Sequence, residues 1–391
     1  MKKKIAILGS TGSIGKQTLE ILKKNKKKFE VVFLSTNKNV KEISKQVKIF
    51  KPKNVIISDN ISYKKYKKKN KKIKIFNDYK SLNKIIKTKL DCVVSAISGF
   101  NGLQPTIDII KFTKLIAIAN KESIICGWNL ISKELKKNKT EFIPVDSEHF
   151  SIWTLINNNN FDIDKIYITA SGGPFINKKR KDLINIRPRD AINHPKWKMG
   201  KKISVDSATM VNKVFEVIEA KKIFNINISK IKILLHPESY VHSIVKFKDG
   251  FSKILIHETD MKIPIYNSLK LNHLMKLRNN EINFNKLNNL NLSVISRKQY
   301  PTLKIIDYFS FKNDSLYETV LVSANDELVD LFLKGKIKFL DIPKKLNMIM
   351  KLNNLIKFKS KKPSNFQQIV NLNKYVRLKT RSLCVRSESN V

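Results

Sequence analysis

A glycine-rich turn near the start of the chain places the strongest constraint on its fold. Residues 4–8 are an apolar run that predicts a strand, residues 9–15 read GSTGSIG, and residues 16–24 have a helical pattern. Glycines permit a tight turn and let the backbone approach a pyrophosphate, which the N-terminus of a helix can bind. The spacing is GxxGxxG, so the flanking strand and helix are needed to predict a dinucleotide-binding domain.

Five more apolar segments predict strands that alternate with helices, at residues 29–35, 54–58, 92–96, 115–119 and 142–145. This alternation indicates a parallel, doubly wound sheet. Ligands of such sheets bind at the carboxyl ends of the strands. Residues 120–123, with the sequence NKES, follow one of these strands and are therefore candidate ligand contacts.

The residues after the second strand bear on the cofactor. An acid that binds the ribose hydroxyls is usual there in NAD sites, but this chain has Thr36, Asn37, Lys38 and Asn39. A cation without an acid favours the 2′-phosphate of NADP. The alternative is that Lys38 is simply one of many lysines.

Two acids follow the strand at residues 142–145. Side chains at i and i+2 of an extended segment point the same way, so Asp146 and Glu148 are expected to face a common centre. With a third carboxylate from Glu216 they would form an open site for Mg²⁺ or Mn²⁺. The alternative is a pair of acids neutralised by lysine. We expect His149 to be structural, because imidazole suits a hard cation less well than oxygen does.

Residues 194–220 predict a basic loop, a serine-rich turn and one helix. Asn212, Lys213 and Glu216 would share a face of that helix. Ser207 and Thr209 would lie near its start, where free backbone N–H groups favour an anion. An ordinary amphipathic helix with a solvated polar face is the alternative.

A long basic segment between the strand at residues 166–170 and Gly200 predicts a lid. Trp197 and Met199 could cover a ligand, although Trp197 could instead pack in the core. Possible hinges are Gly172, Gly173 and Gly200, and Ser171 and His194 could reach a phosphate.

The charge suggests a polyanion or an anionic membrane as partner, with 77 Lys+Arg against 32 Asp+Glu and a net charge of +45. The lysines are scattered, however, and no module interleaves them with exposed aromatic residues, so we expect neither a specific nucleic acid nor a membrane as partner. Three cysteines without CxxC spacing favour a reducing compartment. The first strand leaves no room for a cleavable signal, and no transmembrane run is present, so a cytoplasmic protein is expected.

Seven stretches resemble the 1-deoxy-D-xylulose 5-phosphate reductoisomerase family: GSTGSIG, ANKES, PVDSEH, SGGPF, HPKWKMGKKISVDSATMVNK, HPESYVHSIV and DMKIPI. The match is colinear to about residue 376. It implies an NADPH-dependent enzyme with a divalent metal (Mg²⁺, Mn²⁺ or Co²⁺), usually a homodimer. The reaction would convert 1-deoxy-D-xylulose 5-phosphate to 2-C-methyl-D-erythritol 4-phosphate in non-mevalonate isoprenoid biosynthesis. A degenerate scaffold and another NADP-dependent oxidoreductase are the alternatives.

The resemblance also implies residue roles. The metal ligands would be Asp146, Glu148 and Glu216, with Lys121 joining them as a catalytic residue. The residues in contact with the substrate would be Lys121, Ser147, Glu148, Ser171, His194, Trp197, Ser207, Asn212, Lys213 and Glu216. The cofactor would contact Thr11, Gly12, Ser13, Ile14, Asn37, Lys38, Asn39, Asn120, Glu122, Gly200 and Met261.

The expected fold class is α/β, in four segments. These are a Rossmann-like doubly wound NADPH-binding domain (1–146), an α+β catalytic, metal-binding and dimerisation domain (147–278, lid about 171–201), a connector (279–296) and a small helical C-terminal domain (297–391). The catalytic domain would contain strands at residues 231–235, 241–247 and 252–256. The chain departs from the family in two places. Asn37 replaces a common glycine and is expected to tolerate a left-handed backbone, and residues 379–391 do not align and are expected to fray.

Overall fold

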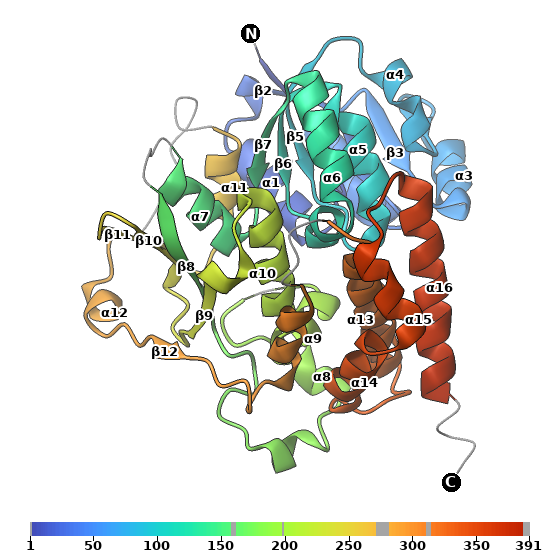
Figure 1. The fold of residues 1–391 in the computed structure, drawn as a ribbon. Helices are drawn as coiled ribbons and strands as arrows, with labels where there is room; N and C mark the ends of the chain where they lie inside the picture. Colours follow the sequence, from blue (N-terminus) through green and yellow to red (C-terminus); the bar gives the residue numbers. More distant parts are fainter. Residues whose placement is uncertain (1, 158–161, 198, 271–280, 310–313, 386–391) are drawn as a thin grey trace. The chain divides into compact units, whose positions relative to one another are not determined.

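The computed structural model describes residues 2–157, 162–197, 199–270, 281–309 and 314–385 (Figure 1). The chain forms two compact units. The first comprises Met1–Ser123, Ile131–Trp153 and Asp260–Asn280, and the second comprises Ile124–Leu130, Thr154–Thr259 and Glu281–Val391. Each unit has its own sheet. The expected four-segment division remains a prediction.

A parallel sheet of seven strands forms the centre of the first unit, in the order β4-β3-β2-β1-β5-β6-β7. The order reverses where β1 lies beside β5, which is the switch point at which doubly wound sheets bind ligands. The predicted parallel, doubly wound architecture is therefore confirmed. The strands are β1 (Lys3–Leu8), β2 (Phe29–Thr36), β3 (Asn54–Ile57), β4 (Lys74–Phe76), β5 (Leu90–Ser95), β6 (Thr113–Ile118) and β7 (Glu141–Pro144).

Helices connect these strands and pack on the sheet (Figure 1). A later segment of the chain returns to this unit, because α11 packs against α1 and its Ile265 and Leu269 are buried in the same apolar core as Leu22. The helices are α1 (Ser13–Lys23), α2 (Val40–Phe50), α3 (Asn60–Lys69), α4 (Leu82–Ile85), α5 (Leu103–Ile110), α6 (Lys121–Asn138) and α11 (Lys262–Ser268), with 3₁₀ segments at Lys26–Lys28, Tyr79–Ser81 and Phe100–Gly102.

Two glycines of the first turn are required by close packing. Gly9 has φ +77°, and a Cβ there would lie 2.6 Å from the carbonyl oxygen of Ala96 at the end of β5. A Cβ on Gly15 would lie 2.5 Å from the carbonyl oxygen of Gly9. At Gly12 the nearest atom would be 3.4 Å away, an ordinary contact. The third glycine thus allows the helix to approach the turn, whereas the second is not needed for packing.

The second unit contains a mixed five-stranded sheet in the order β11-β10-β8-β9-β12. β8 and β9 are parallel and the other pairs are antiparallel. The three predicted strands are confirmed, and β12 lies inside the expected connector together with the short helix α12, so that segment is partly structured. The strands are β8 (Ile163–Ala170), β9 (Ile231–Leu235), β10 (Val241–Phe247), β11 (Ser252–Ile256) and β12 (Ser293–Val294), and α12 spans Phe284–Asn288.

Helices make up the rest of this unit, and α13, which is almost entirely buried, packs against α9, α14 and α16. The prediction of a frayed tail is wrong as far as Val385, because α16 continues through this stretch and buries Thr380 and Cys384. Residues 386–391 lie outside the described residues. The helices are α8 (Pro188–Ala191), α9 (Lys201–Ala208), α10 (Val211–Phe224), α13 (Tyr317–Leu333), α14 (Asp341–Met350), α15 (Asn353–Ile356) and α16 (Phe366–Val385), with 3₁₀ segments at Arg180–Leu183, Ile228–Lys230, Pro301–Phe309 and Lys357–Ser360.

No helix within the described part of the chain combines the length and the apolar composition needed to cross a membrane.

We expect Gly15→Ala to destabilise the protein and Gly12→Ala to leave it nearly unchanged. The added methyl group at position 15 would overlap the backbone of Gly9, at a cost of about 1–3 kcal/mol. Position 12 has room for it, so the free energy of unfolding should change by less than about 0.5 kcal/mol. Urea unfolding followed by circular dichroism measures both. Equal losses in the two variants would contradict this account of the turn.

Candidate active site

The glycine turn leads into α1 without a side-chain cap. Gly12 is the N-cap of α1 and has an extended backbone, so no side chain occupies the helix N-terminus. Ser13 and Ile14 begin the helix. The hydroxyl of Thr11 lies 2.8 Å from that of Thr36 and joins the ends of β1 and β2. Backbone N–H groups in the first turn thus remain suited to an anion such as a pyrophosphate.

The three residues after β2 differ in how they are used. The Asn39 side chain caps α2 by accepting the Glu42 N–H at 3.1 Å, and Asn37 donates to the Ser58 hydroxyl at 2.9 Å. The Lys38 side chain is 75% exposed and only 4.0 Å from an Asp59 carboxylate oxygen, a weak surface pair. Lys38 therefore remains available to an anion.

The left-handed backbone that Asn37 was expected to tolerate is not adopted at this position. Asn37 is absent from the non-glycine residues with positive φ in the described ranges. Asparagine thus stands at this position without needing the conformational freedom of a glycine.

Asn120 and Lys121 follow β6 and are both buried. Asn120 is the N-cap of α6, accepting the Ser123 N–H, and donates to the carbonyl oxygen of Gly99 at 2.8 Å. The Lys121 ammonium pairs with the Asp146 carboxylate. Glu122 lies in the first turn of α6. The amide of Asn120 therefore orders the loop, and its predicted contact with a cofactor remains a prediction.

The extended conformation expected for residues 146–148 is wrong. Helix α7 (Ser147–Ile156) begins directly after Asp146. An Asp146 carboxylate oxygen accepts the backbone N–H groups of Glu148 at 3.2 Å and His149 at 3.4 Å. Aspartate is among the best N-terminal caps, so it starts a helix here. Glu148 lies in the first helical turn, where its carboxylate accepts the Ser147 hydroxyl.

Asp146 is held in its ionised form. Burial raises the pKa of this carboxyl group, but the Lys121 ammonium and a hydrogen bond with His149 outweigh burial and hold the pKa well below its ordinary value. The His149 ring is fully buried, and its Nδ1 lies 2.9 Å from the Asp146 oxygen. His149 therefore supports a carboxylate, in agreement with its predicted structural role.

The prediction of a single helix after the basic loop is also wrong. Met210, with φ +61°, separates α9 from α10. Ser207 thus lies in the last turn of α9, and Thr209 follows it. The buried Thr209 hydroxyl donates to the carbonyl oxygen of Val205 at 3.0 Å, so it serves the helix end.

Three polar side chains of α10 share one face, as predicted. The Asn212 amide donates to one Glu216 carboxylate oxygen, and the Lys213 ammonium pairs with the other. Lys213 also donates to the carbonyl oxygen of Thr169 at 2.7 Å. Lys213 and Glu216 are buried, which fixes both charges in place.

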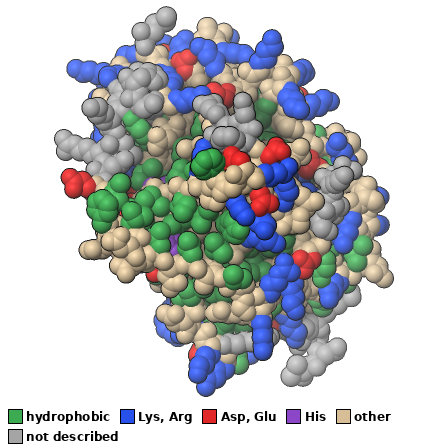
Figure 2. Space-filling view, turned by 60° about the vertical axis from the view of Figure 1, so that its left-hand side comes forward, with side chains coloured by type: hydrophobic (Ala, Val, Ile, Leu, Met, Phe, Trp, Pro, Cys, Tyr) green, Lys and Arg blue, Asp and Glu red, His purple; other side chains and the backbone are tan. Residues whose placement is uncertain are grey.

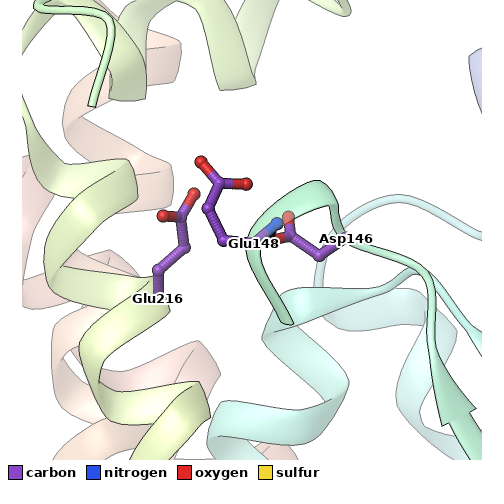
Figure 3. A group of neighbouring side chains, drawn as sticks. All are labelled: Asp146, Glu148 and Glu216. Atoms are coloured by element: carbon purple, nitrogen blue, oxygen red, sulfur yellow. Dashed lines mark hydrogen bonds between the residues drawn. The ribbon is translucent and has the colours of Figure 1, made fainter. Parts of the chain in front are cut away.

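Asp146, Glu148 and Glu216 form the three-carboxylate group that the sequence predicted. Each offers one oxygen, and these oxygens lie within 4.8 Å of one another (Figure 3). Three carboxylate oxygens without a sulfur or imidazole donor suit a hard divalent cation such as Mg²⁺ or Mn²⁺.

His194 joins the start of the lid to its later part. Its Nδ1 accepts the backbone N–H groups of Lys196 and Trp197, both at 3.1 Å. Its Nε2 lies 3.0 Å from the Ser171 hydroxyl. Burial and the nearby Lys213 charge lower the pKa of His194 to about 4. The neutral ring must therefore carry its proton on Nε2 and donate to Ser171, whose own hydrogen is left for a ligand.

The lid residues are only partly covered. Trp197 is half-buried, with its ring edge-on to His242 at 6.0 Å between centroids. His242 in turn stacks on His257 at 3.6 Å, a pair that the sequence reasoning did not predict. Gly172 and Gly173 have φ of +86° and +70°, a conformation typical of glycine. Gly200 is the N-cap of α9, and Met261, before α11, is partly buried against the core of the first unit.

A doubly wound sheet with a glycine-rich turn after its first strand is typical of dinucleotide-binding domains. Together with the three carboxylates, it indicates a class of protein, the nicotinamide-dependent oxidoreductases that also use a divalent cation. Family models agree with this class. The model for 1-deoxy-D-xylulose 5-phosphate reductoisomerase matches residues 5–127, and two models for C-terminal domains of the same enzyme match residues 142–224 and 256–379.

Individual proteins give the same result. A 1-deoxy-D-xylulose 5-phosphate reductoisomerase of Pelagibacter ubique is 57% identical over 98% of this chain and 100% of its own length. One of Clostridium kluyveri is 41% identical over 87% of this chain and 90% of its own. This chain therefore belongs to the 1-deoxy-D-xylulose 5-phosphate reductoisomerase family of oxidoreductases.

Solved structures of this enzyme share the fold. The Zymomonas mobilis enzyme in complex with NADPH is 30% identical, with a TM-score of 0.87 over 98% of this chain and 99% of its own. A DOX-P reductoisomerase in complex with NADPH, fosmidomycin and magnesium is 29% identical, with a TM-score of 0.90 over 99% of each chain.

We expect the His194 ring to stay neutral down to about pH 4, with its proton on Nε2. An unfolded histidine takes up a proton near pH 6.5. The free energy of unfolding should therefore fall as the pH is lowered from 6.5 toward 4. Nitrogen-15 NMR of the imidazole measures the midpoint and the tautomer directly. Urea unfolding of the protein beside His194→Gln isolates the contribution of His194. A midpoint near 6.5 would contradict the described hydrogen bonds.

Proposed function

We propose that this protein catalyses the NADPH-dependent isomerisation and reduction of 1-deoxy-D-xylulose 5-phosphate to 2-C-methyl-D-erythritol 4-phosphate, a step of non-mevalonate isoprenoid (isopentenyl diphosphate) biosynthesis. The observation that carries the proposal is the three-carboxylate group of Asp146, Glu148 and Glu216. The 57% identity to the Pelagibacter ubique enzyme supports it. A scaffold that had lost catalysis would not need three acids gathered at one point.

The carboxylates fit a divalent metal, for which Mg²⁺, Mn²⁺ and Co²⁺ are the candidates. We assign Asp146, Glu148 and Glu216 as ligands, because all three offer hard oxygen donors. The cation would act as a Lewis acid toward two oxygens of the substrate. Lys121, paired with Asp146, would be the catalytic cation beside the reacting carbons.

The phosphate of the substrate would lie among neutral donors and one cation. Lys213 supplies the charge, and the Ser171 hydroxyl has a hydrogen to donate because Ser171 accepts from His194. Binding this remote group would favour closure of the lid with Trp197 over the sugar. The full assignment for the substrate is Lys121, Ser147, Glu148, Ser171, His194, Trp197, Ser207, Asn212, Lys213 and Glu216.

NADPH would bind at the carboxyl edge of the parallel sheet and supply the hydride. The uncapped N-terminus of α1 suits its pyrophosphate, and the exposed Lys38 suits its 2′-phosphate. We assign to the cofactor Thr11, Gly12, Ser13, Ile14, Asn37, Lys38, Asn39, Asn120, Glu122, Gly200 and Met261.

We also propose the roles of four segments and the location of the protein. Residues 1–146 would bind NADPH, and residues 147–278 would carry catalysis, metal binding and dimerisation. Residues 279–296 would connect this domain to residues 297–391, which would support the fold.

All three cysteines are free buried thiols, which is typical of a reducing compartment such as the cytoplasm.

An apolar sheet face supports a homodimer. Tyr167, Ile244 and Ile254 lie side by side in register on β8, β10 and β11. Tyr167 and Ile244 are half-buried, and Ile254 is exposed. Phe251 and Val294, at the two edges of this sheet, are 66% and 86% exposed. Figure 2 shows hydrophobic side chains gathered on the face turned forward. Monomers rarely expose such a patch.

We expect Glu216→Gln to abolish metal-dependent NADPH oxidation while the variant stays folded and binds NADPH. The amide keeps the shape of the side chain but lacks the charge that a cation needs, so kcat should fall by roughly a hundredfold or more. The assay follows NADPH absorbance with 1-deoxy-D-xylulose 5-phosphate and Mg²⁺ or Mn²⁺. Glu134→Gln on α6 is the control and should retain activity. Full activity of Glu216→Gln would exclude the assigned role.

We expect Ile254→Asp to convert the dimer to a monomer, because a carboxylate would be buried without a partner in the apolar contact. Size-exclusion chromatography with light scattering gives the mass. Ile61→Asp, at an isoleucine that is 79% exposed on α3, is the matched control and should not change the mass. A monomeric unmodified protein would refute the dimer outright.

A further inference from the structure

Three side chains from the C-terminal part of the chain form hydrogen bonds to the segments that contain Ser171 and Ser207, which are assigned to the substrate phosphate. The Tyr300 hydroxyl donates to the carbonyl oxygen of Gly172 at 3.4 Å, and the Thr302 hydroxyl donates to that of Thr209 at 2.5 Å. The Asn325 amide on α13 donates to a carboxylate oxygen of Asp206 at 2.7 Å. The last of these involves a buried charge and is therefore the strongest of the three.

Asp206 is a fully paired carboxylate in the interior. It is 2% exposed and lies in the last turn of α9. One oxygen accepts from Asn325, and the other accepts from the Lys202 ammonium at 2.8 Å. Lys202 also lies 3.1 Å from an Asp326 oxygen. A buried carboxylate needs such partners, so these contacts fix the turn of α9 against α13.

Ser207 directly follows Asp206 and is the residue of this turn that a ligand can reach. Within residues 204–210 every residue except Ser207 is buried. The backbone of Gly173 comes close to that of Ser207, because a Cβ added to Gly173 would lie only 3.0 Å from the Ser207 carbonyl oxygen. Ser171 begins the segment that contains Gly173. A shift of the α9 turn would therefore move Ser207 relative to Ser171.

We propose that Asp206 and Asn325 are positioning residues, which hold the last turn of α9 so that the Ser207 hydroxyl meets the phosphate of the substrate. The inference rests on the proposed function, which supplies that phosphate. It assigns a role in substrate binding to α13, a helix that otherwise carries no chemistry. Neither side chain would touch the substrate, because both are buried and bonded to each other.

The pair should affect substrate affinity more than cofactor affinity. Asn325→Leu leaves a buried Asp206 oxygen without its donor, and Asp206→Asn removes the charge with almost no change of shape. Losing one hydrogen bond to a charged group corresponds to roughly a tenfold change. We expect KM for 1-deoxy-D-xylulose 5-phosphate to rise about tenfold in either variant, while KM for NADPH stays within about twofold.

The matched control is a second buried hydrogen bond of α13. Asn373 on α16 donates to the Ser323 hydroxyl at 2.7 Å, without involving α9. Asn373→Leu should lower the melting temperature like Asn325→Leu but leave both KM values unchanged. If Asn325→Leu fails to fold, the nearly isosteric Asp206→Asn variant provides the test.

Exchanging the side chains of Asp206 and Asn325 is the most direct test of the positioning role. The double variant Asp206→Asn with Asn325→Asp rebuilds the bond with donor and acceptor reversed, and it should restore KM for the substrate. Unchanged KM in folded single variants, or a rise of the same size in Asn373→Leu, would overturn the inference. So would an exchange that restores the melting temperature but not KM.

Failure of the proposed function would be seen separately. Calorimetric titration of the unmodified protein with 1-deoxy-D-xylulose 5-phosphate tests that function before any variant is made. If this sugar phosphate does not bind, inorganic phosphate is titrated instead into the same set of variants. Weaker phosphate binding in Asn325→Leu but not in Asn373→Leu would still support the positioning role, and equal binding would overturn it.

Discussion

Two buried lysines make the candidate site possible. Lys121 pairs with Asp146, and Lys213 pairs with Glu216, so two of the three carboxylates have an ammonium partner inside the protein. A buried carboxylate without a partner would take up a proton and lose its value as a ligand. In a chain with 77 basic and 32 acidic residues, scarce acids are thus kept charged where charge is needed. Loss of either lysine would leave a costly uncompensated charge.

Much of the fold and of the candidate site could be predicted because parallel strands impose a shared geometry. The carboxyl ends of β1, β2, β6 and β7 meet at one edge of the sheet, so polar residues after those strands were expected together. The face shared by Asn212, Lys213 and Glu216 followed from helical spacing alone. Both predictions needed only local pattern and the regular geometry of an element.

Predictions failed where a single backbone conformation decided the outcome. Asp146 starts a helix that its strand-like neighbourhood concealed, although an aspartate before a helical pattern is a known start signal. Met210 adopts a left-handed conformation that methionine rarely takes, so the break between α9 and α10 left no trace in the sequence. The bond between Asp206 and Asn325 joins residues far apart in the chain, which no local pattern can reveal.

The return of α11 to the first unit has a consequence for the order in which the chain can fold. Ile265, Tyr266 and Leu269 complete a core whose other buried members precede residue 151. During synthesis, strands β8 to β11 of the second sheet leave the ribosome before α11 does. Until α11 has been synthesised, the core of the nascent first unit therefore remains incomplete and its apolar side chains stay partly exposed. The two units are thus synthesised in alternating segments of the chain. For the same reason, no single proteolytic cut would release the first unit whole.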